Sequence, residues 1–169
     1  MTSAIIACVK QEERYVREWM DYHISIGFDH FYLADNNDDG YEPSLSSVIQ
    51  DYIDEGKVDI VECHDVHPIQ PSCYNTVLGK YGNLYDWYDI IDIDEFITLP
   101  KEKDIKTFLS KFTDTDIVFL HWLNYGDSEL LQYEDKPVLE RFVQHAIGGR
   151  KVPYIKLLFR ADKIGKMRN

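Results

Sequence analysis

Short apolar runs alternate with amphipathic segments along the first part of the chain. Four runs have the length and content of buried strands, at residues 3–9, 30–34, 58–63 and 87–92. The segments between them carry apolar residues at helical spacing: one follows the first strand, one begins at Pro43, and one covers residues 72–81. Strands and helices in this order predict an α/β sandwich with a mostly parallel central sheet.

Two glycines are expected to end the first two helices, Gly27 and Gly56. The first helix is predicted to turn one apolar face inward, formed by Tyr15, Trp19, Tyr22 and Ile26. Later in the chain the pattern predicts a helix over residues 105–112, a strong strand over 116–123, and weaker strands near 138–142 and 154–159. A chain of 169 residues with 44% hydrophobic content can bury one core, so a single domain is expected.

The net charge of -12 is unevenly distributed. Residues 150–169 hold seven basic side chains against one acid, so the preceding residues are strongly acidic. An acidic body argues against nucleic acid as a partner, because a phosphate backbone is bound through clustered Lys and Arg. The basic segment suits donor phosphates or anionic lipid, and a solvated terminus is the alternative.

The three cysteines, Cys8, Cys63 and Cys73, are odd in number and lie in or beside apolar stretches, which argues against a disulfide framework. No apolar run approaches the roughly 20 residues that span a bilayer, and no signal peptide is evident at the start. The chain is therefore predicted to be cytoplasmic, with contact to the inner face of the membrane through its basic segment as an option.

Acidic residues gather where the predicted strands end. Ligands of parallel α/β sheets sit beyond the carboxyl ends of the strands. Those ends here carry residues 10–13, 35–39, 63–67 and 92–95. A ligand site is expected at this edge of the sheet.

The sharpest signal is Asp92-Ile93-Asp94-Glu95 at the end of the fourth strand. Strand alternation would place Asp92 and Asp94 on one side, with Ile93 on the other. Adjacent carboxylates repel unless a cation lies between them, and hard oxygen ligands suit Mg²⁺ or Mn²⁺. Such an ion could bridge to a diphosphate leaving group. The alternative is a strand end whose acids cap the next turn.

Two segments in the correct order carry a family resemblance. The fourth strand region reads WYDIIDIDEFITLP, and the opening reads ACVKQEERYVREWMDYHISIGFDHFYLADNNDDG. Together they resemble GT-A glycosyltransferases, in particular the family 2-like and family 92-like groups, over residues 3–125. The resemblance implies a Rossmann-like three-layer GT-A fold, with residues 1–99 as the nucleotide-sugar half and residues 100–169 as an incomplete acceptor-side half.

The resemblance also implies roles for individual residues. Asp35, followed by Asn36, would contact the base or ribose of the donor, and Asp92 and Asp94 would hold ribose and metal. Glu95 would be a supporting acid. The turn from Lys10 to Glu12 would pass beside the base, although Gln11 stands where many relatives have Asn.

Two other metal sites fit the sequence less well. The run from Asp35 to Gly40 matches the first half of an EF-hand loop, but Ser46 stands where the bidentate Glu is required. A zinc set can be written from residues whose spacing follows no common pattern: Cys63, His64, His67 and Cys73.

The stretch HWLNYGDSEL resembles the Trp-containing acceptor-side segment of family 92-like enzymes. Aromatic and polar groups together suit stacking on a sugar ring and hydrogen bonding to its hydroxyls. An inverting transfer needs a general base, and Asp127 and Glu129 are the candidates, with solvated loop acids as the alternative. GT-A enzymes usually continue further, so the resemblance implies a chain truncated at its C-terminal side.

The predicted function is metal-dependent transfer of a sugar from a nucleoside-diphosphate sugar, with a UDP-sugar favoured, to a glycan hydroxyl in surface polysaccharide or lipopolysaccharide synthesis. Two alternatives remain open. One is a glycan- or partner-binding module without turnover. The other is an Asp-x-Asp phosphoryl-transfer enzyme, although the chain contains no Gly-rich phosphate loop.

Overall fold

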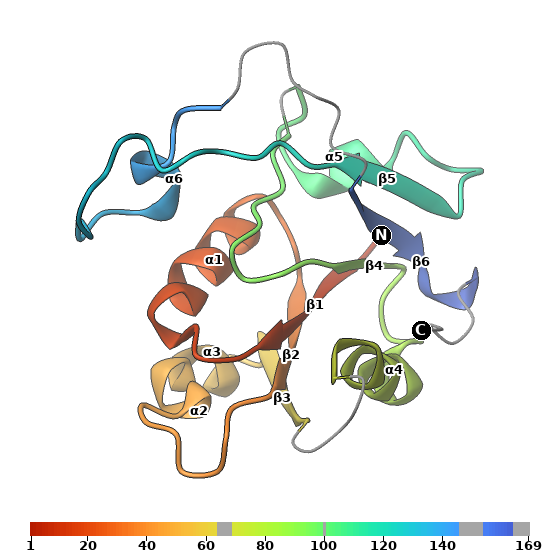
Figure 1. Cartoon of the computed structure of the whole chain (residues 1–169). Coiled ribbons are helices and arrows are strands. Elements are labelled where there is room, and N and C mark those ends of the chain that lie inside the picture. Colours follow the sequence, from red (N-terminus) through yellow and green to blue (C-terminus); the bar gives the residue numbers. More distant parts are fainter. Residues whose placement is uncertain (64–68, 100, 146–153, 164–169) are drawn as a thin grey trace. The chain divides into compact units, whose positions relative to one another are not determined.

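The computed structural model describes residues 1–63, 69–99, 101–145 and 154–163 (Figure 1). It contains two compact units. One comprises Met1–Val118 with Leu157–Asn169, and the other comprises Phe119–Lys156.

A six-stranded sheet has the order β3-β2-β1-β4-β6-β5. The strands are β1 (Ser3–Val9), β2 (His30–Asp35), β3 (Val58–Glu62), β4 (Trp87–Ile90), β5 (Ile117–His121) and β6 (Ile155–Arg160). Strands β1 to β4 pair in parallel, whereas β6 runs antiparallel to β4. The mostly parallel sheet predicted from the alternating pattern is confirmed.

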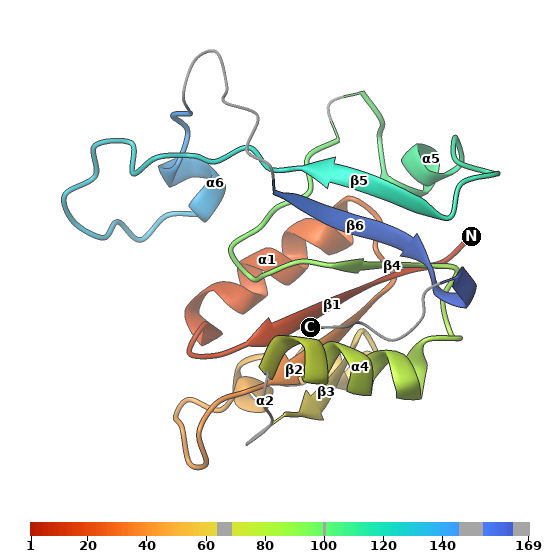
Figure 2. The same ribbon diagram turned by 45° about the vertical axis from the view of Figure 1, so that its right-hand side comes forward.

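Helices cover both faces of this sheet in the larger unit. Helix α1 (Glu13–Ser25) lies on one face and helix α4 (Ile69–Tyr81) on the other (Figures 1 and 2). Because side chains alternate along a strand, Ile6 packs toward Val77 of α4. Phe31 instead meets the Trp19 ring of α1 at 5.5 Å. This arrangement is the predicted three-layer sandwich.

The inward face of α1 differs from the predicted one by a rotation about the helix axis. Its buried residues are Glu13, Val16, Trp19, Met20 and His23. Of the predicted face only Trp19 is buried, and the other three side chains are partly exposed. Gly27 and Gly56 have φ angles of 98° and 67°, which confirms that each ends a helix in the left-handed conformation.

The helix predicted to follow Pro43 is divided. Helix α2 (Leu45–Val48) and helix α3 (Gln50–Asp54) are separated by Ile49, whose φ of -123° lies outside the helical range. Ile49 is fully buried. The backbone at Ile49 leaves the helical conformation as its side chain enters the core, and this divides a segment whose apolar residues repeat at helical spacing.

The strand predicted near residues 138–142 is wrong, because Val138–Arg141 forms a short helix, α6. Pro137 precedes this helix, where its fixed φ suits a helical start. Arg141 is buried, and its Nε donates to the carbonyl oxygen of Lys136 at 2.8 Å. The strand expected near 154–159 is confirmed as β6, and the helix expected over 105–112 is shorter, with α5 at Ile105–Leu109.

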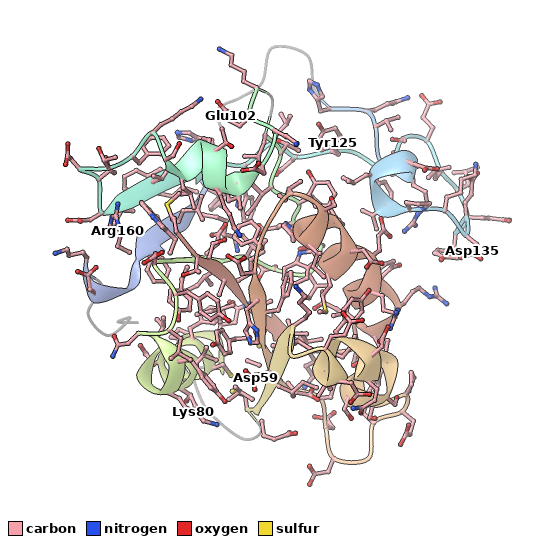
Figure 3. The ribbon with its side chains drawn as sticks, turned by 180° about the vertical axis from the view of Figure 1, so that it is seen from behind. Asp59, Lys80, Glu102, Tyr125, Asp135 and Arg160 are labelled. Carbon is pink, nitrogen blue, oxygen red and sulfur yellow. The ribbon has the colours of Figure 1, made fainter. Side chains whose placement is uncertain are left out.

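Arg160, at the end of β6, belongs to the basic segment (Figure 3). Its Nε donates to the carbonyl oxygen of Thr115 at 3.1 Å, and its guanidinium lies 4.7 Å from the centroid of the Trp87 ring. Most other basic residues of the segment lie outside the described ranges, so membrane contact stays a prediction. Within those ranges no helix has the length and apolar content that a bilayer crossing requires. All three cysteines are free, as expected.

Candidate functional site

A pocket of about 440 Å³ opens at the carboxyl edge of the sheet in the larger unit. The described residues that line it are Cys8, Lys10, Glu12, Asn36, Gln70, Asp92 and Asp94. These residues come from the ends of β1 and β2, from the first turn of α4, and from the turn after β4. The pocket therefore lies where a parallel α/β sheet binds its ligands.

Most residues predicted to hold donor and metal meet in this pocket. Lys10, Glu12, Asn36, Asp92 and Asp94 all line it. Their individual roles stay predictions.

Asp35 is the exception among the predicted set, because it is not among the residues that line the pocket. Its Oδ1 accepts a 3.0 Å hydrogen bond from the backbone N–H of Asn37, so the carboxylate stabilises the loop that follows β2. The neighbouring Asn36 faces the pocket in its place. A donor contact by Asp35 stays a prediction.

A turn, rather than strand alternation, brings the two aspartates to one side. Strand β4 ends at Ile90, two residues before Asp92. The backbone N–H of Asp92 donates to Glu95 Oε2 at 3.0 Å, and the N–H of Glu95 donates back to the Asp92 carbonyl oxygen at 3.1 Å. Ile93 is buried, whereas Asp94 is exposed to the pocket. Glu95 therefore caps the turn, and the aspartates are left facing the cavity.

The pocket is acidic. Burial, followed by the nearby carboxylates of Asp94 and Asp92, raises the pKa of Glu12 to about 7. Among the described residues of the lining, Lys10 is the only cation, and its Nζ lies 3.3 Å from the exposed Asp38 carboxylate. An exposed pair of this kind contributes little to stability. Three carboxylates against one lysine repel an anionic ligand unless a cation enters with it.

The carboxylate oxygens of the pocket suit a hard divalent cation that is held jointly by the protein and by the phosphates of a bound donor. In the described part of the chain, no group of three or more His, Cys, Asp or Glu residues could hold a metal ion by itself. Mg²⁺ and related ions are commonly bound through one or two carboxylates together with substrate phosphates. Asp92 and Asp94 supply a set of that kind, so they suit an ion that arrives with a diphosphate.

The alternative metal sites receive no support. His64 and His67 lie outside the described residues. Cys63 and Cys73 are buried, and this burial is the main reason why the pKa of each thiol is raised. The loop after Asp35 follows a strand rather than a helix, so it is not an EF-hand.

Two lining residues were absent from the sequence prediction. Gln70 lies in the first turn of α4, which begins at Ile69, whereas the predicted helix begins at residue 72. Proline is tolerated in the first turn of a helix, so Pro71 was the residue in the sequence that could have indicated that α4 begins before residue 72. Cys8 lies near the end of β1, and burial raises the pKa of its thiol to about 11. The thiol is therefore neutral at physiological pH.

The predicted general bases lie in the smaller unit. Asp127 and Glu129 are both exposed, and the N–H of Glu129 donates to Asp127 Oδ1 at 3.0 Å. The loop is anchored where the N–H of Gly126 donates to the Gln144 carbonyl oxygen at 2.8 Å. Asp127 thus has a local structural role, and its role or that of Glu129 as a base stays a prediction.

The fold resembles that of known structures. Residues 1–349 of Staphylococcus aureus TarS align with a TM-score of 0.51 and 17% identity, over 69% of this chain and 34% of that one. The 4-diphosphocytidyl-2C-methyl-D-erythritol synthase of Anaerococcus prevotii gives a TM-score of 0.53 and 12% identity, over 95% and 70% of the two chains. At these identities the likeness concerns the fold alone, and it agrees with the expected GT-A architecture.

Sequence relatives define the family more closely. A glycosyltransferase family 92 protein of Ricinus communis is 31% identical over 99 residues, which cover 57% of this chain and 17% of that protein. A galactan beta-1,4-galactosyltransferase of Arabidopsis thaliana is 26% identical over 104 residues, which cover 58% of this chain and 21% of that protein. The matched region thus spans about a fifth of each of these relatives. The family model of glycosyltransferase family 92 matches residues 4–169, and the chain therefore belongs to that family.

Proposed function

We propose that this chain forms the donor-binding part of a glycosyltransferase that moves a sugar from a nucleoside-diphosphate sugar to a hydroxyl of a glycan. The observation that carries the proposal is the convergence of Glu12, Asp92 and Asp94 in one pocket at the carboxyl edge of the sheet. Membership of glycosyltransferase family 92 gives the reaction class. A UDP-sugar is the donor to test first.

A divalent ion, Mn²⁺ or Mg²⁺, on Asp92 and Asp94 would neutralise the charge that develops on the leaving diphosphate. Around it, Lys10 offers a positive charge to a phosphate. The first turn of α4 also borders the pocket through Gln70, and the N–H groups of a helix start favour anions. The acidic lining and the anionic donor then become compatible.

In the proposed reaction, the acceptor hydroxyl oxygen forms a bond to the anomeric carbon as the bond to the diphosphate oxygen breaks. The configuration at that carbon inverts. The hydroxyl proton passes to a general base, for which Asp127 and Glu129 are the candidates. Synthesis of a surface polysaccharide or lipopolysaccharide, with membrane contact through the basic segment, is the proposed setting.

Calorimetric titration of UDP into the 169-residue chain, with Mn²⁺ or with a chelator, tests the site. We expect UDP to bind only with the metal. We expect Asp94→Asn to weaken UDP binding by about tenfold or more, because a charged ligand of the metal is lost. Asp114→Asn is the matched control, since it makes the same change at an exposed position outside the pocket. Equal binding with chelator, or unchanged affinity in Asp94→Asn, contradicts the assignment.

Turnover separates the alternatives. Slow hydrolysis of a UDP-sugar that stops with chelator would support a transferase and argue against a binding module without turnover. Release of pyrophosphate from a nucleoside triphosphate would instead indicate nucleotidyl transfer. The fold shared with the Anaerococcus prevotii synthase makes that comparison worth including.

A further inference from the structure

Asn37 is a buried amide behind the wall of the pocket. Its side chain is 5% exposed, and it is not among the lining residues. Asn37 Oδ1 accepts a 2.7 Å hydrogen bond from the backbone N–H of Gln11, and Asn37 Nδ2 donates a 2.6 Å hydrogen bond to Glu13 Oε1. One amide group therefore joins the loop after β2 to the turn after β1.

The turn that Asn37 holds has an unfavourable backbone conformation. Gln11 has a φ of 59°, in the left-handed region that residues other than glycine seldom occupy. The residues on either side, Lys10 and Glu12, both face the pocket. Because such a conformation persists only where surrounding contacts maintain it, the bond from Gln11 to Asn37 is the contact best placed to fix these two side chains.

Glu13 completes the connection on the helix side. It is the first residue of α1 and is 5% exposed, so its carboxylate is removed from water. The short bond from Asn37 supplies a charge-assisted donor to this buried group. Asn37 can make both bonds because an amide has a carbonyl oxygen that accepts and an NH2 group that donates. A carboxylate at position 37 would instead face the carboxylate of Glu13.

We infer that Asn37 and Glu13 form a positioning pair that sets the geometry of the Lys10–Glu12 turn for a nucleoside diphosphate. The inference rests on the proposed function for the identity of the ligand. Neither residue touches the ligand in this scheme, so the pair acts only through the turn that it holds.

Reversing the direction of the hydrogen bond tests the pair. Asn37→Asp removes the donor and sets two carboxylates against each other, whereas adding Glu13→Gln restores a donor on the opposite side. In the double variant the new Gln amide donates to the Asp, whose other oxygen still accepts from the Gln11 N–H. Asn83→Asp, at an exposed position outside the pocket, is the matched control.

Two measurements on the 169-residue chain separate this inference from the proposed function. Amide hydrogen exchange at Gln11 needs no ligand, and we expect it to accelerate in Asn37→Asp and to return toward the wild-type rate in the double variant. In titrations of UDP with Mn²⁺, we expect Asn37→Asp to bind about tenfold more weakly and the double variant to recover to within about threefold. Glu13→Gln alone keeps an oxygen that accepts from Asn37 but removes the charge that strengthens the bond, so we expect an effect smaller than that of Asn37→Asp in both measurements.

The outcomes differ for the two ideas. Unchanged amide exchange at Gln11 in Asn37→Asp overturns the positioning pair. The pair is also overturned if the double variant recovers neither the wild-type exchange rate at Gln11 nor the affinity for UDP. Failure of the wild-type chain to bind UDP overturns the proposed donor, while the exchange data still decide whether the pair holds the turn. If Asn37→Asp does not fold, Asn37→Ala removes both bonds without adding a charge, and the same two measurements apply to it.

Discussion

The indole N–H of Trp19 donates a 2.9 Å hydrogen bond to the carbonyl oxygen of Glu95, which lies 76 positions later in the chain. Trp19 is a fully buried residue of α1, and Glu95 ends the turn that carries the two pocket aspartates. Two more residues of the same helix hold Ile97, two positions further on: Tyr22 donates to the Ile97 carbonyl oxygen, and His23 Nε2 accepts from the Ile97 N–H. Helix α1 therefore both fills the core and fixes the acidic turn.

Replacing Trp19 with Phe should weaken the fold and the site together. Phe keeps most of the apolar volume but leaves the Glu95 carbonyl oxygen without this donor. We expect the free energy of unfolding to fall by about 1–3 kcal/mol, as for a lost buried hydrogen bond. Urea unfolding monitored by circular dichroism measures the change, and UDP titration with Mn²⁺ should show weaker binding.

Trp87→Phe is the matched control, because Trp87 is also fully buried and its Nε1 has no hydrogen-bond partner among the described residues. That substitution changes the volume by the same amount without removing a hydrogen bond. The prediction is wrong if Trp19→Phe costs no more stability than Trp87→Phe.

Acid should destabilise the chain through His23. Burial lowers the pKa of His23 to about 4, and its ring nitrogens contact the Trp19 carbonyl oxygen and the Ile97 N–H. In the unfolded chain the pKa returns to about 6.5. Between these values the unfolded state binds more protons, so stability decreases as the pH falls.

The contribution of His23 should be roughly 2 kcal/mol between pH 7 and pH 5. The readout is the difference in unfolding free energy between the two pH values, for wild type and for His23→Gln. The variant removes the titrating group, so its pH dependence should be shallower by about that amount. Equal pH dependence in both proteins would show that His23 has the same pKa in the folded and unfolded chains, which would contradict the prediction.

The sequence predicted the layers of this fold because the strands are marked by their own residues. The run Ser3–Val9 is almost entirely buried, and only a continuous apolar segment suits a strand with helices on both sides. Residues 138–142 gave no such signal, since a five-residue run of mixed character fits a strand or one turn of helix equally well. The preceding Pro137 was the only local indication of the helix.

The site residues that directly follow a strand could be predicted from the sequence. Asp92 and Asp94 stand out because acids directly follow an apolar run, although a turn rather than strand alternation brings them to one side. Asn37 and Glu13 could not be paired from the sequence, because their contact depends on how two separate loops pack. Gln70 depends on where α4 begins, and helix ends are the least certain feature of a sequence pattern.

Glu12 should make the fold less stable at alkaline pH. Its pKa is about 7 in the folded chain and about 4.5 in the unfolded chain, so the folded state binds more protons between these values. Stability therefore decreases as the pH rises through this window. Because the side chain is only partly buried, we expect Glu12→Gln to raise the free energy of unfolding at pH 8 by only about 1 kcal/mol.

Urea unfolding in the presence of a chelator, at pH 4 and at pH 8, measures this effect. At pH 4 the Glu is mostly protonated in both states, so the variant should be close to wild type. Replacing the chelator with Mn²⁺ and UDP together at pH 8 should stabilise wild type more than Glu12→Gln, since the cation relieves repulsion among the three carboxylates. A variant that is less stable than wild type at pH 8 would contradict the prediction.

The left-handed conformation of Gln11 gives a last prediction. Asn adopts positive φ more readily than Gln, and Gln11→Asn retains the backbone N–H that donates to Asn37. We expect the free energy of unfolding to rise by about 0.5 kcal/mol, with no loss of UDP affinity. Gln50→Asn makes the same chemical change at the first residue of helix α3. There Asn is the poorer helix former, and it shortens the side chain that donates to Asp54 Oδ1 at 2.8 Å, so stability should fall by a few tenths of a kcal/mol. Urea unfolding measures both changes. A rise in the free energy of unfolding for Gln11→Asn and a fall for Gln50→Asn would show that backbone conformation at position 11, rather than side-chain chemistry, controls the stability of this turn. A decrease in both variants would contradict that account.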